Sequence, residues 1–223
     1  MIVGDSADNT IDGGAGHDLI CGLAGNDALR GGVGDDRVAG DEGNDRVAGD
    51  VVNFAASAVG GGDDLLYGGD GNDSMTGDSV GASPVGGGND VMRGGEGNDT
   101  MIGDANAFTG DATGGGDDRL AGGPGRDAMT GDSSADSGNP TGSGDDLLDL
   151  GPGDRGLAIG DHNTNTPGRT ASGAGNDRIS GGHANDLLIG DSAVDNVIDA
   201  GHDELEGLSG DDILFGDTHR LDR

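Results

Sequence analysis

Large aliphatic residues recur at intervals of nine along most of this chain. The series is Ile2, Ile11, Ile20, Leu29, Val38, Val47, Leu66, Met75, Met92, Met101, Leu120, Met129, Leu148, Leu157, Ile179, Leu188, Leu205 and Leu214. Because successive side chains of a strand point to opposite faces, one inward residue between two outward ones is typical of a three-residue strand. A fixed internal period of this kind predicts a repeat protein built from many short strands.

Each aliphatic residue is the eighth member of a nine-residue unit that also contains a glycine and an aspartate at fixed places. Four consecutive units occupy residues 13–48 and have the sequences GGAGHDLIC, GLAGNDALR, GGVGDDRVA and GDEGNDRVA. The fourth residue of each is glycine, which suits a backbone with positive φ or one whose carbonyl groups crowd around a ligand. Each unit is therefore predicted to be a tight turn that ends in aspartate and leads into a strand.

The sixth-position aspartates are the candidate metal ligands. They are Asp18, Asp27, Asp36, Asp45, Asp64, Asp73, Asp90, Asp99, Asp118, Asp127, Asp146, Asp177, Asp186, Asp203 and Asp212. Asn9 and Arg155 take the same position in two other units. Because a guanidinium group cannot bind a cation, we expect a flaw in the series of metal sites at Arg155, on both sides of that residue.

Six inserts interrupt the nine-residue pattern, and each follows a Gly-Asp pair. The pairs are at 49–50, 77–78, 103–104, 131–132, 160–161 and 190–191. Counting units from Ile2 places every insert along the same edge of the predicted stack. Segments such as 51–59 could form a third strand in each turn, but other inserts are polar and contain Pro140 or Pro167, and proline removes a ladder hydrogen bond. Loops are therefore favoured, with a third strand as the alternative.

Composition adds a strong negative charge that the repeat must accommodate. The 223 residues include 52 Gly and have a formal net charge of -32, a profile that resembles disordered chains. However, 39 of the 43 acidic residues are Asp, which favours carboxylates placed in tight turns. Such a chain is repelled by phosphate backbones and anionic membranes, so no nucleic-acid partner is expected. No apolar run or leader sequence indicates a membrane span or an amino-terminal signal peptide.

The unit G-G-x-G-x-D-x-U-x, in which U is a large aliphatic residue, resembles the repeat of the RTX, or haemolysin-type, calcium-binding proteins. This resemblance implies an all-β fold, a right-handed parallel β-roll or β-solenoid. About nine turns of two nonapeptides are expected, with insert loops along one edge. Residues 1–223 would form a single domain, with uninterrupted nonapeptides in 1–48, paired nonapeptides with inserts in 49–217 and a tail in 218–223.

The resemblance also implies that calcium ions lie between loops one full turn apart, held by the sixth-position carboxylates and by loop carbonyl groups. Neighbouring aspartates form seven pairs on the insert edge and five on the other edge, so about twelve Ca²⁺ ions are expected. Calcium accepts six to eight oxygen ligands, which suits such loops. We therefore expect a protein that folds on binding calcium, and we infer a secreted, extracellular location from this calcium requirement.

Other functions receive less support from the residues. No zinc motif, nucleophile elbow or paired-cysteine site is present in the sequence, so no enzymatic activity and no catalytic residues are expected. An adhesin-like or polysaccharide-binding module, which would contact a cell-surface or polysaccharide ligand through the insert edge, is one alternative. The detached repeat region of a secreted protease or lipase is another, because such enzymes carry similar repeats.

Overall fold

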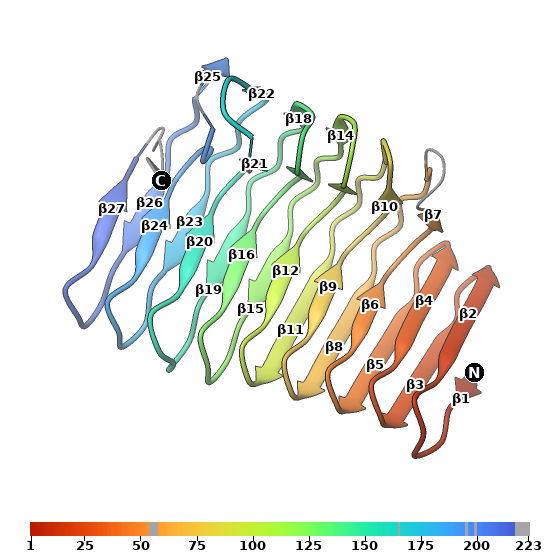
Figure 1. The fold of residues 1–223 in the computed structure, drawn as a ribbon. Helices are drawn as coiled ribbons and strands as arrows, with labels where there is room; N and C mark the ends of the chain where they lie inside the picture. Colours follow the sequence, from red (N-terminus) through yellow and green to blue (C-terminus); the bar gives the residue numbers. More distant parts are fainter. Residues whose placement is uncertain (54–57, 165, 195, 199, 217–223) are drawn as a thin grey trace.

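The computed structural model describes residues 1–53, 58–164, 166–194, 196–198 and 200–216 of the chain. Within these residues all regular secondary structure is β, in short strands stacked side by side along a rod (Figure 1). A search of the same residues finds no helix that is long and apolar enough to cross a membrane. The expected all-β class is confirmed.

Two nine-stranded parallel sheets, here called sheet A and sheet B, form the body of the rod. Sheet A contains β1 (Ile2–Val3), β3 (Leu19–Ala24), β5 (Arg37–Glu42), β8 (Leu65–Asp70), β11 (Val91–Glu96), β15 (Arg119–Ala121), β19 (Leu147–Asp149), β23 (Arg178–Ser180) and β26 (Glu204–Glu206). Sheet B contains β2 (Thr10–Ala15), β4 (Ala28–Val33), β6 (Arg46–Ala48), β9 (Ser74–Thr76), β12 (Thr100–Ile102), β16 (Ala128–Thr130), β20 (Leu157–Ile159), β24 (Leu187–Ile189) and β27 (Ile213–Phe215). The chain alternates between the two sheets, which confirms the parallel β-solenoid.

The eighth-position aliphatic residues form the core between the two sheets. Ile20, Val38 and Leu66 stand opposite one another on neighbouring strands of sheet A and are at most 1% exposed. Met75 and Met101 occupy the equivalent places in sheet B and are equally buried. Removing such a side chain from water contributes about 1.5–3 kcal/mol, so these two rows, one from each sheet, supply the main hydrophobic stabilisation of the turns.

The inserts form strands, so the interpretation of them as loops was wrong. One five-stranded sheet contains β7 (Val52–Asn53), β10 (Val80–Gly81), β13 (Asn106–Ala107), β17 (Ser134–Ala135) and β21 (Asn163–Thr164). A four-stranded sheet contains β14 (Ala112–Thr113), β18 (Pro140–Thr141), β22 (Thr170–Ser172) and β25 (Asn196–Ile198). Pro140 is tolerated because it is the first residue of its strand. Alanines fill the interior: Ala105, Ala107, Ala112 and Ala135 form a fully buried cluster.

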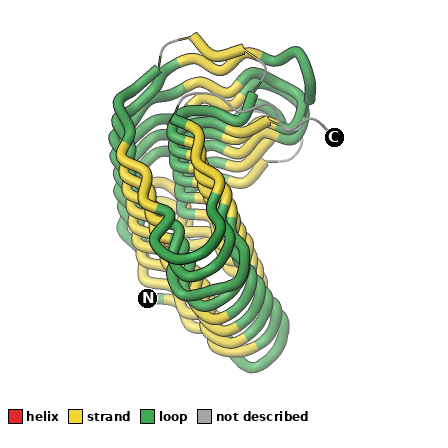
Figure 2. The backbone as a smooth tube through the Cα atoms, turned by 90° about the vertical axis from the view of Figure 1, so that its left-hand side faces the viewer, coloured by secondary structure: helices red, strands yellow, loops and turns green. Residues whose placement is uncertain are grey.

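The insert strands change the outline of the turns along the rod. Viewed along its length, the two sheets form an elongated body, and the inserts form an arm that bends away from one edge (Figure 2). About six turns have this longer outline, so the count differs from the expected nine turns of two nonapeptides with insert loops, although the fold itself matches. Small buried residues, in place of large aliphatic ones, support the arm, which explains why the hydrophobic pattern did not predict it.

The nine-residue frame also shifts by one residue at 150–158. Ala158, and not Leu157, lies opposite Met129 and Leu188 in sheet B and is fully buried in the core. Leu157 is only partly buried and packs against a second apolar cluster that contains Ile159 and Ile189. The small Ala158 leaves room that Leu150 occupies, since Leu150 is 3% exposed and belongs to the same core cluster.

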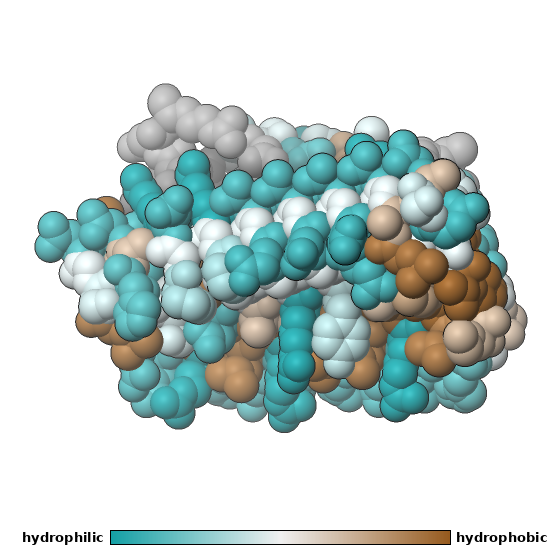
Figure 3. Space-filling view, turned by 90° about the horizontal axis from the view of Figure 1, so that it is seen from below, coloured by the Kyte–Doolittle hydropathy of each residue, from teal (hydrophilic) through white to brown (hydrophobic). Residues whose placement is uncertain are grey.

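Hydrophilic residues follow the loops in rows along the face seen in Figure 3, and hydrophobic residues gather toward the amino-terminal end. The exposed apolar side chains of the first turns are those of Met1, Val3, Leu19, Leu23 and Val33. Between the two ends of the rod most aliphatic residues of the repeat are enclosed between the sheets, whereas Leu214 in the last strand is 42% exposed. The surface is therefore dominated by the turns, where the aspartates lie.

Candidate metal centres

The structure arranges the predicted aspartates in two columns, one on each edge of the rod. The insert edge lies where the chain passes from sheet B to sheet A, and the opposite edge lies where it passes from sheet A to sheet B. Asp18, Asp36, Asp64, Asp90, Asp118, Asp146, Asp177 and Asp203 lie on the insert edge. Asp27, Asp45, Asp73, Asp99, Asp127, Asp186 and Asp212 lie on the opposite edge.

One oxygen of each sixth-position carboxylate after Asp18 ties two turns together. Oδ1 of Asp64 accepts a hydrogen bond from the backbone N–H of Asp36 at 2.7 Å, and Oδ1 of Asp90 accepts one from Asp64 at 2.7 Å. The opposite edge repeats this arrangement, since Oδ1 of Asp73 accepts from the N–H of Asp45 at 2.7 Å. Each aspartate is thereby fixed with its second oxygen directed elsewhere.

The second oxygen, Oδ2, is buried without a hydrogen-bond partner in twelve of these fifteen aspartates. They are Asp27, Asp36, Asp45, Asp64, Asp73, Asp90, Asp99, Asp118, Asp127, Asp146, Asp177 and Asp186. The other three, Asp18, Asp203 and Asp212, lie in the end turns and are less buried. A buried ionised carboxylate is very costly unless it is paired or binds a metal, so the repeated orphan oxygens indicate a positively charged ligand.

Backbone carbonyl groups share the space around these orphan oxygens. At Gly40, the first residue of its unit, an added Cβ would collide with Oδ2 of Asp45 and lie 2.7 Å from the carbonyl oxygen of Gly68 in the next turn. A carboxylate oxygen and a carbonyl oxygen therefore border the same small space beside Gly40, and only glycine, which lacks a Cβ, leaves this space open. An unpartnered carboxylate oxygen beside a backbone carbonyl oxygen matches the oxygen ligands that a hard cation such as calcium prefers.

The pKa values of these carboxyl groups differ between the two edges. Burial, reinforced by neighbouring aspartates, raises the pKa of Asp64 to about 8 and that of Asp177 to about 10 on the insert edge. On the opposite edge, burial raises the pKa of Asp73 and of Asp99 only to about 6. The insert edge is the more deeply covered, so its carboxylates are in greater need of a positive partner.

At the place where Arg155 was expected to interrupt the aspartate series, the structure puts Gly156 in the sixth position. The backbone N–H of Gly156, not that of Arg155, donates to Oδ1 of Asp186 at 2.7 Å, as the shifted frame requires. Gly156 has no side chain, so the sixth position lacks a carboxylate here. Burial raises the pKa of the Asp186 carboxyl group, and the nearby Arg155 guanidinium opposes this rise only in part. The absence of bound ions on either side of this position stays a prediction.

Sequence reasoning missed a further set of buried carboxylates. The aspartates of the Gly-Asp pairs were used only to mark where inserts begin, yet all six are 0% exposed: Asp50, Asp78, Asp104, Asp132, Asp161 and Asp191. Asp50, Asp64 and Asp78 each offer a carboxylate oxygen within 4.8 Å of the others. The regular recurrence of aspartate after glycine was the signal that could have identified them as ligands.

Comparison with known families agrees with this geometry. The model of the RTX calcium-binding nonapeptide repeat (4 copies) matches residues 1–29, 22–53, 58–79, 85–107, 112–137, 171–197 and 199–218. The unmatched residues 138–170 include the loop in which Gly156 replaces a sixth-position aspartate. A search of curated proteins finds no match. Because the family model covers well over half of the sequence, the chain belongs to the RTX calcium-binding nonapeptide repeat family, whose repeats imply calcium binding.

Proposed function

We propose that this protein is a calcium-dependent, non-enzymatic β-solenoid, in which about twelve Ca²⁺ ions bound by the sixth-position aspartates make folding favourable at neutral pH. The observation that carries the proposal is the set of twelve buried Oδ2 atoms without a hydrogen-bond partner. Asp64, Asp90 and their equivalents would hold the ions together with the facing carbonyl groups. Calcium would supply the positive charge that the rest of the site lacks.

The magnitude of the electrostatic problem supports calcium-dependent folding. At a strand spacing of about 4.8 Å and an effective dielectric constant of about 20, two ionised carboxylates repel each other by about 3.5 kcal/mol. A few such pairs exceed the net stability of about 5–15 kcal/mol that is typical of a folded domain. A ligand that binds only the folded chain shifts the equilibrium toward it by mass action.

Calcium titration of calcium-free protein, followed by far-ultraviolet circular dichroism and size-exclusion chromatography, tests the proposal. We expect the chain to be expanded in chelator and to gain a β-sheet spectrum with a smaller hydrodynamic radius as calcium is added. Magnesium is the control, because its strict octahedral geometry and firmly held waters fit these loops poorly. A full β-sheet spectrum in excess chelator at pH 7.5 would overturn the proposal.

We also propose that the protein acts outside the cell. Calcium-binding modules with affinities in the range of about 10⁻⁴–10⁻³ M are suited to extracellular calcium, and a fold that depends on many such sites would persist there. Fractionation of the producing cells, with detection of the full-length chain by antibody, tests this location. Recovery of the folded protein only from the cytoplasm would contradict it.

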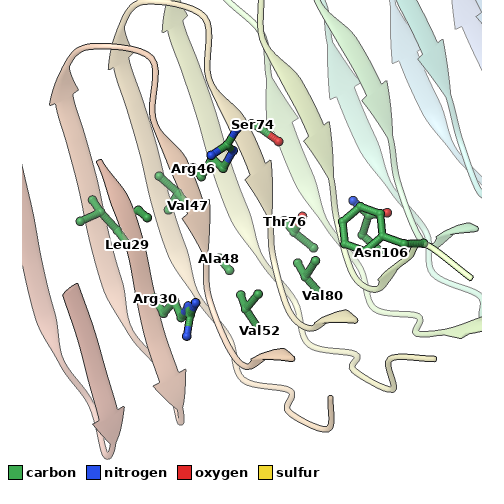
Figure 4. A pocket seen from close by; sticks show the side chains of 12 residues that line it. Leu29, Arg30, Arg46, Val47, Ala48, Val52, Ser74, Thr76, Val80 and Asn106 are labelled. Atoms are coloured by element: carbon green, nitrogen blue, oxygen red, sulfur yellow. The ribbon is translucent and has the colours of Figure 1, made fainter. Parts of the chain in front are cut away.

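A second candidate function is the binding of a polysaccharide or a cell-surface ligand beside the inserts. A cavity of about 530 Å³ lies where sheet B meets the insert strands, and Arg30, Arg46, Thr76, Asn106 and Phe108 line it (Figure 4). Most of the lining surface is apolar, and the guanidinium, amide and hydroxyl groups with one aromatic ring provide a few polar contacts for an amphipathic ligand such as a sugar. A glycan array probed in calcium tests it, with the double variant Arg30→Ala/Arg46→Ala as the control for specific binding.

A further inference from the structure

The aspartates of the six Gly-Asp pairs form a second carboxylate column beside the sixth-position aspartates of the insert edge. The backbone N–H of Asp104 donates to the carbonyl oxygen of Asp132 at 3.1 Å, and the N–H of Asp132 donates to that of Asp161 at 3.0 Å. The same bond joins the other neighbours in the series, Asp50 to Asp78, Asp78 to Asp104 and Asp161 to Asp191. The backbone thus stacks these residues one per turn.

Several carboxylate oxygens in this second column have no hydrogen-bond donor. Both oxygens of Asp132 and both of Asp50 are buried without a partner, and so is Oδ2 of Asp78, Asp104 and Asp161. These residues are 0% exposed. Carboxylates of successive members lie within hydrogen-bonding reach of each other, although an ionised carboxylate can only accept. Either a proton or a cation must therefore lie between them.

The grouping of three carboxylates fits a cation. Asp50, Asp64 and Asp78 each offer an oxygen within 4.8 Å of the others. Two ligands of one calcium ion, each 2.3–2.6 Å from it, lie at most about 5 Å apart, so a single ion could contact all three. Among the described residues, only Asp50, Asp64 and Asp78 approach one another this closely. The later turns stack the same kinds of residue in the same register, because Asp64, Asp90 and Asp118 precede paired strands of sheet A.

Charge balance favours a divalent ion at this edge. Each turn buries one carboxylate from each column, as Asp104 and Asp118 show. The two negative charges of these carboxylates equal in magnitude the charge of one Ca²⁺ ion. The opposite edge buries only the sixth-position carboxylate in each turn. The neighbouring charged groups that act on Asp104, Asp118 and Asp132 are other aspartates, so no arginine performs the neutralising role.

We propose that the Gly-Asp aspartates are a second set of calcium ligands, so that the insert edge holds ions in sites richer in carboxylate than those of the opposite edge. The protein then has two classes of site, and the inserts build the tighter class by supplying Asp50, Asp78, Asp104, Asp132 and Asp161 as ligands. This inference rests on the proposed function, because each such site also includes a sixth-position aspartate.

Isothermal titration calorimetry, with calcium added to calcium-free Asp132→Asn protein at pH 7.5, tests the inference. Thermal unfolding of the same variant is measured in the presence of calcium. The matched control is Asp117→Asn, which removes the same charge from an exposed position where other turns carry Asn89 and Asn176. We expect Asp132→Asn to weaken one or two sites at least tenfold and to reduce the calcium-dependent rise in Tm. Asp117→Asn should change calcium affinity less than twofold.

The outcomes separate this inference from the proposed function. If the unmodified protein binds no calcium, the proposed function fails. If it binds calcium, but Asp132→Asn has the same isotherm as Asp117→Asn, only the second ligand column is overturned, because protons and not ions then lie between its carboxylates. If Asp132→Asn does not fold in calcium, Asp50→Asn at the end of the column replaces it, and loss of one tight site there supports the inference while an unchanged isotherm overturns it.

Discussion

Truncation of Leu150 tests the shifted frame at 150–158, where the structure departs from the nine-residue pattern. Leu150 is 3% exposed and fills the core beside Ala158, whereas Leu157 is only partly buried outside this core. Leu→Ala at a buried core position costs about 2–5 kcal/mol, including the cavity that remains. We expect Leu150→Ala to lower the free energy of unfolding by an amount in this range. Leu157→Ala should lower it by only about 1–2 kcal/mol, because the Leu157 side chain buries less apolar area than that of Leu150.

Urea unfolding in saturating calcium, monitored by circular dichroism, measures these differences as shifts in the midpoint at constant slope. The double variant Leu150→Ala/Ala158→Leu provides a rescue, because it returns a large side chain to the place opposite Met129 and Leu188. It should recover part of the stability lost in Leu150→Ala. A larger loss for Leu157→Ala than for Leu150→Ala, without rescue by Ala158→Leu, would show that Leu157 is the inward residue and refute the shifted frame.

Two further predictions concern pH and the tight loops. Because the pKa values of Asp64 and Asp78 are about 8 in the folded chain, above the ordinary value of about 3.9, the folded state binds more protons between these pH values. Their stabilising contribution to the calcium-free fold is fully present below about pH 4 and is lost as the pH rises through about 8. Circular dichroism of dialysed, calcium-free protein should therefore show more β-sheet at pH 4.5 than at pH 8.5, and a spectrum independent of pH would contradict this. Gly71→Ala should destabilise the calcium-bound protein by about 1–3 kcal/mol more than Gly16→Ala, since both have positive φ but only at Gly71 would the added Cβ collide with the Gly43 carbonyl oxygen. Equal urea midpoints for the two variants would contradict the close approach of the loops.

The repeat pattern predicted the two main sheets because one large residue per unit, such as Ile20 or Leu66, is enough to mark an inward position. It also placed all fifteen sixth-position aspartates in two edge columns, since the inserts are all on one side. The arm was not predicted because its interior is made largely of small residues such as Ala107 and Ser133, which have no distinctive periodic signal. Pro140 was given too much weight, since a two-residue strand that begins with proline loses little hydrogen bonding.

The errors at the site have a similar physical origin. A strict count of nine placed Arg155 among the sixth-position residues, but the loop holds one more residue and Gly156 makes the hydrogen bond to Asp186. Spacing alone cannot distinguish these alternatives, because Leu157 and Ala158 are both apolar. Likewise, Asp50 and Asp78 follow glycine at a chain position that marks an insert. Their burial involves residues far along the insert, since Gly60 lies against Asp50 and the N–H of Gly62 donates to Oδ1 of Asp78.

The hydrogen bonds between turns give the rod a head and a tail. Each sixth-position Oδ1 bonded in this way accepts from the turn that precedes it, as Asp64 does from Asp36, whereas fifth-position side chains accept from the turn that follows, as Oδ1 of Asp63 does from the N–H of Asn89. A cut between two turns therefore leaves a different arrangement of donors and acceptors on each fragment. The two new surfaces are complementary to each other and not to themselves. Nearly every interface between turns along the rod has this same direction. Whole turns can therefore be duplicated or deleted while donors still face acceptors at the new interface, which allows such a protein to change its length by one turn at a time.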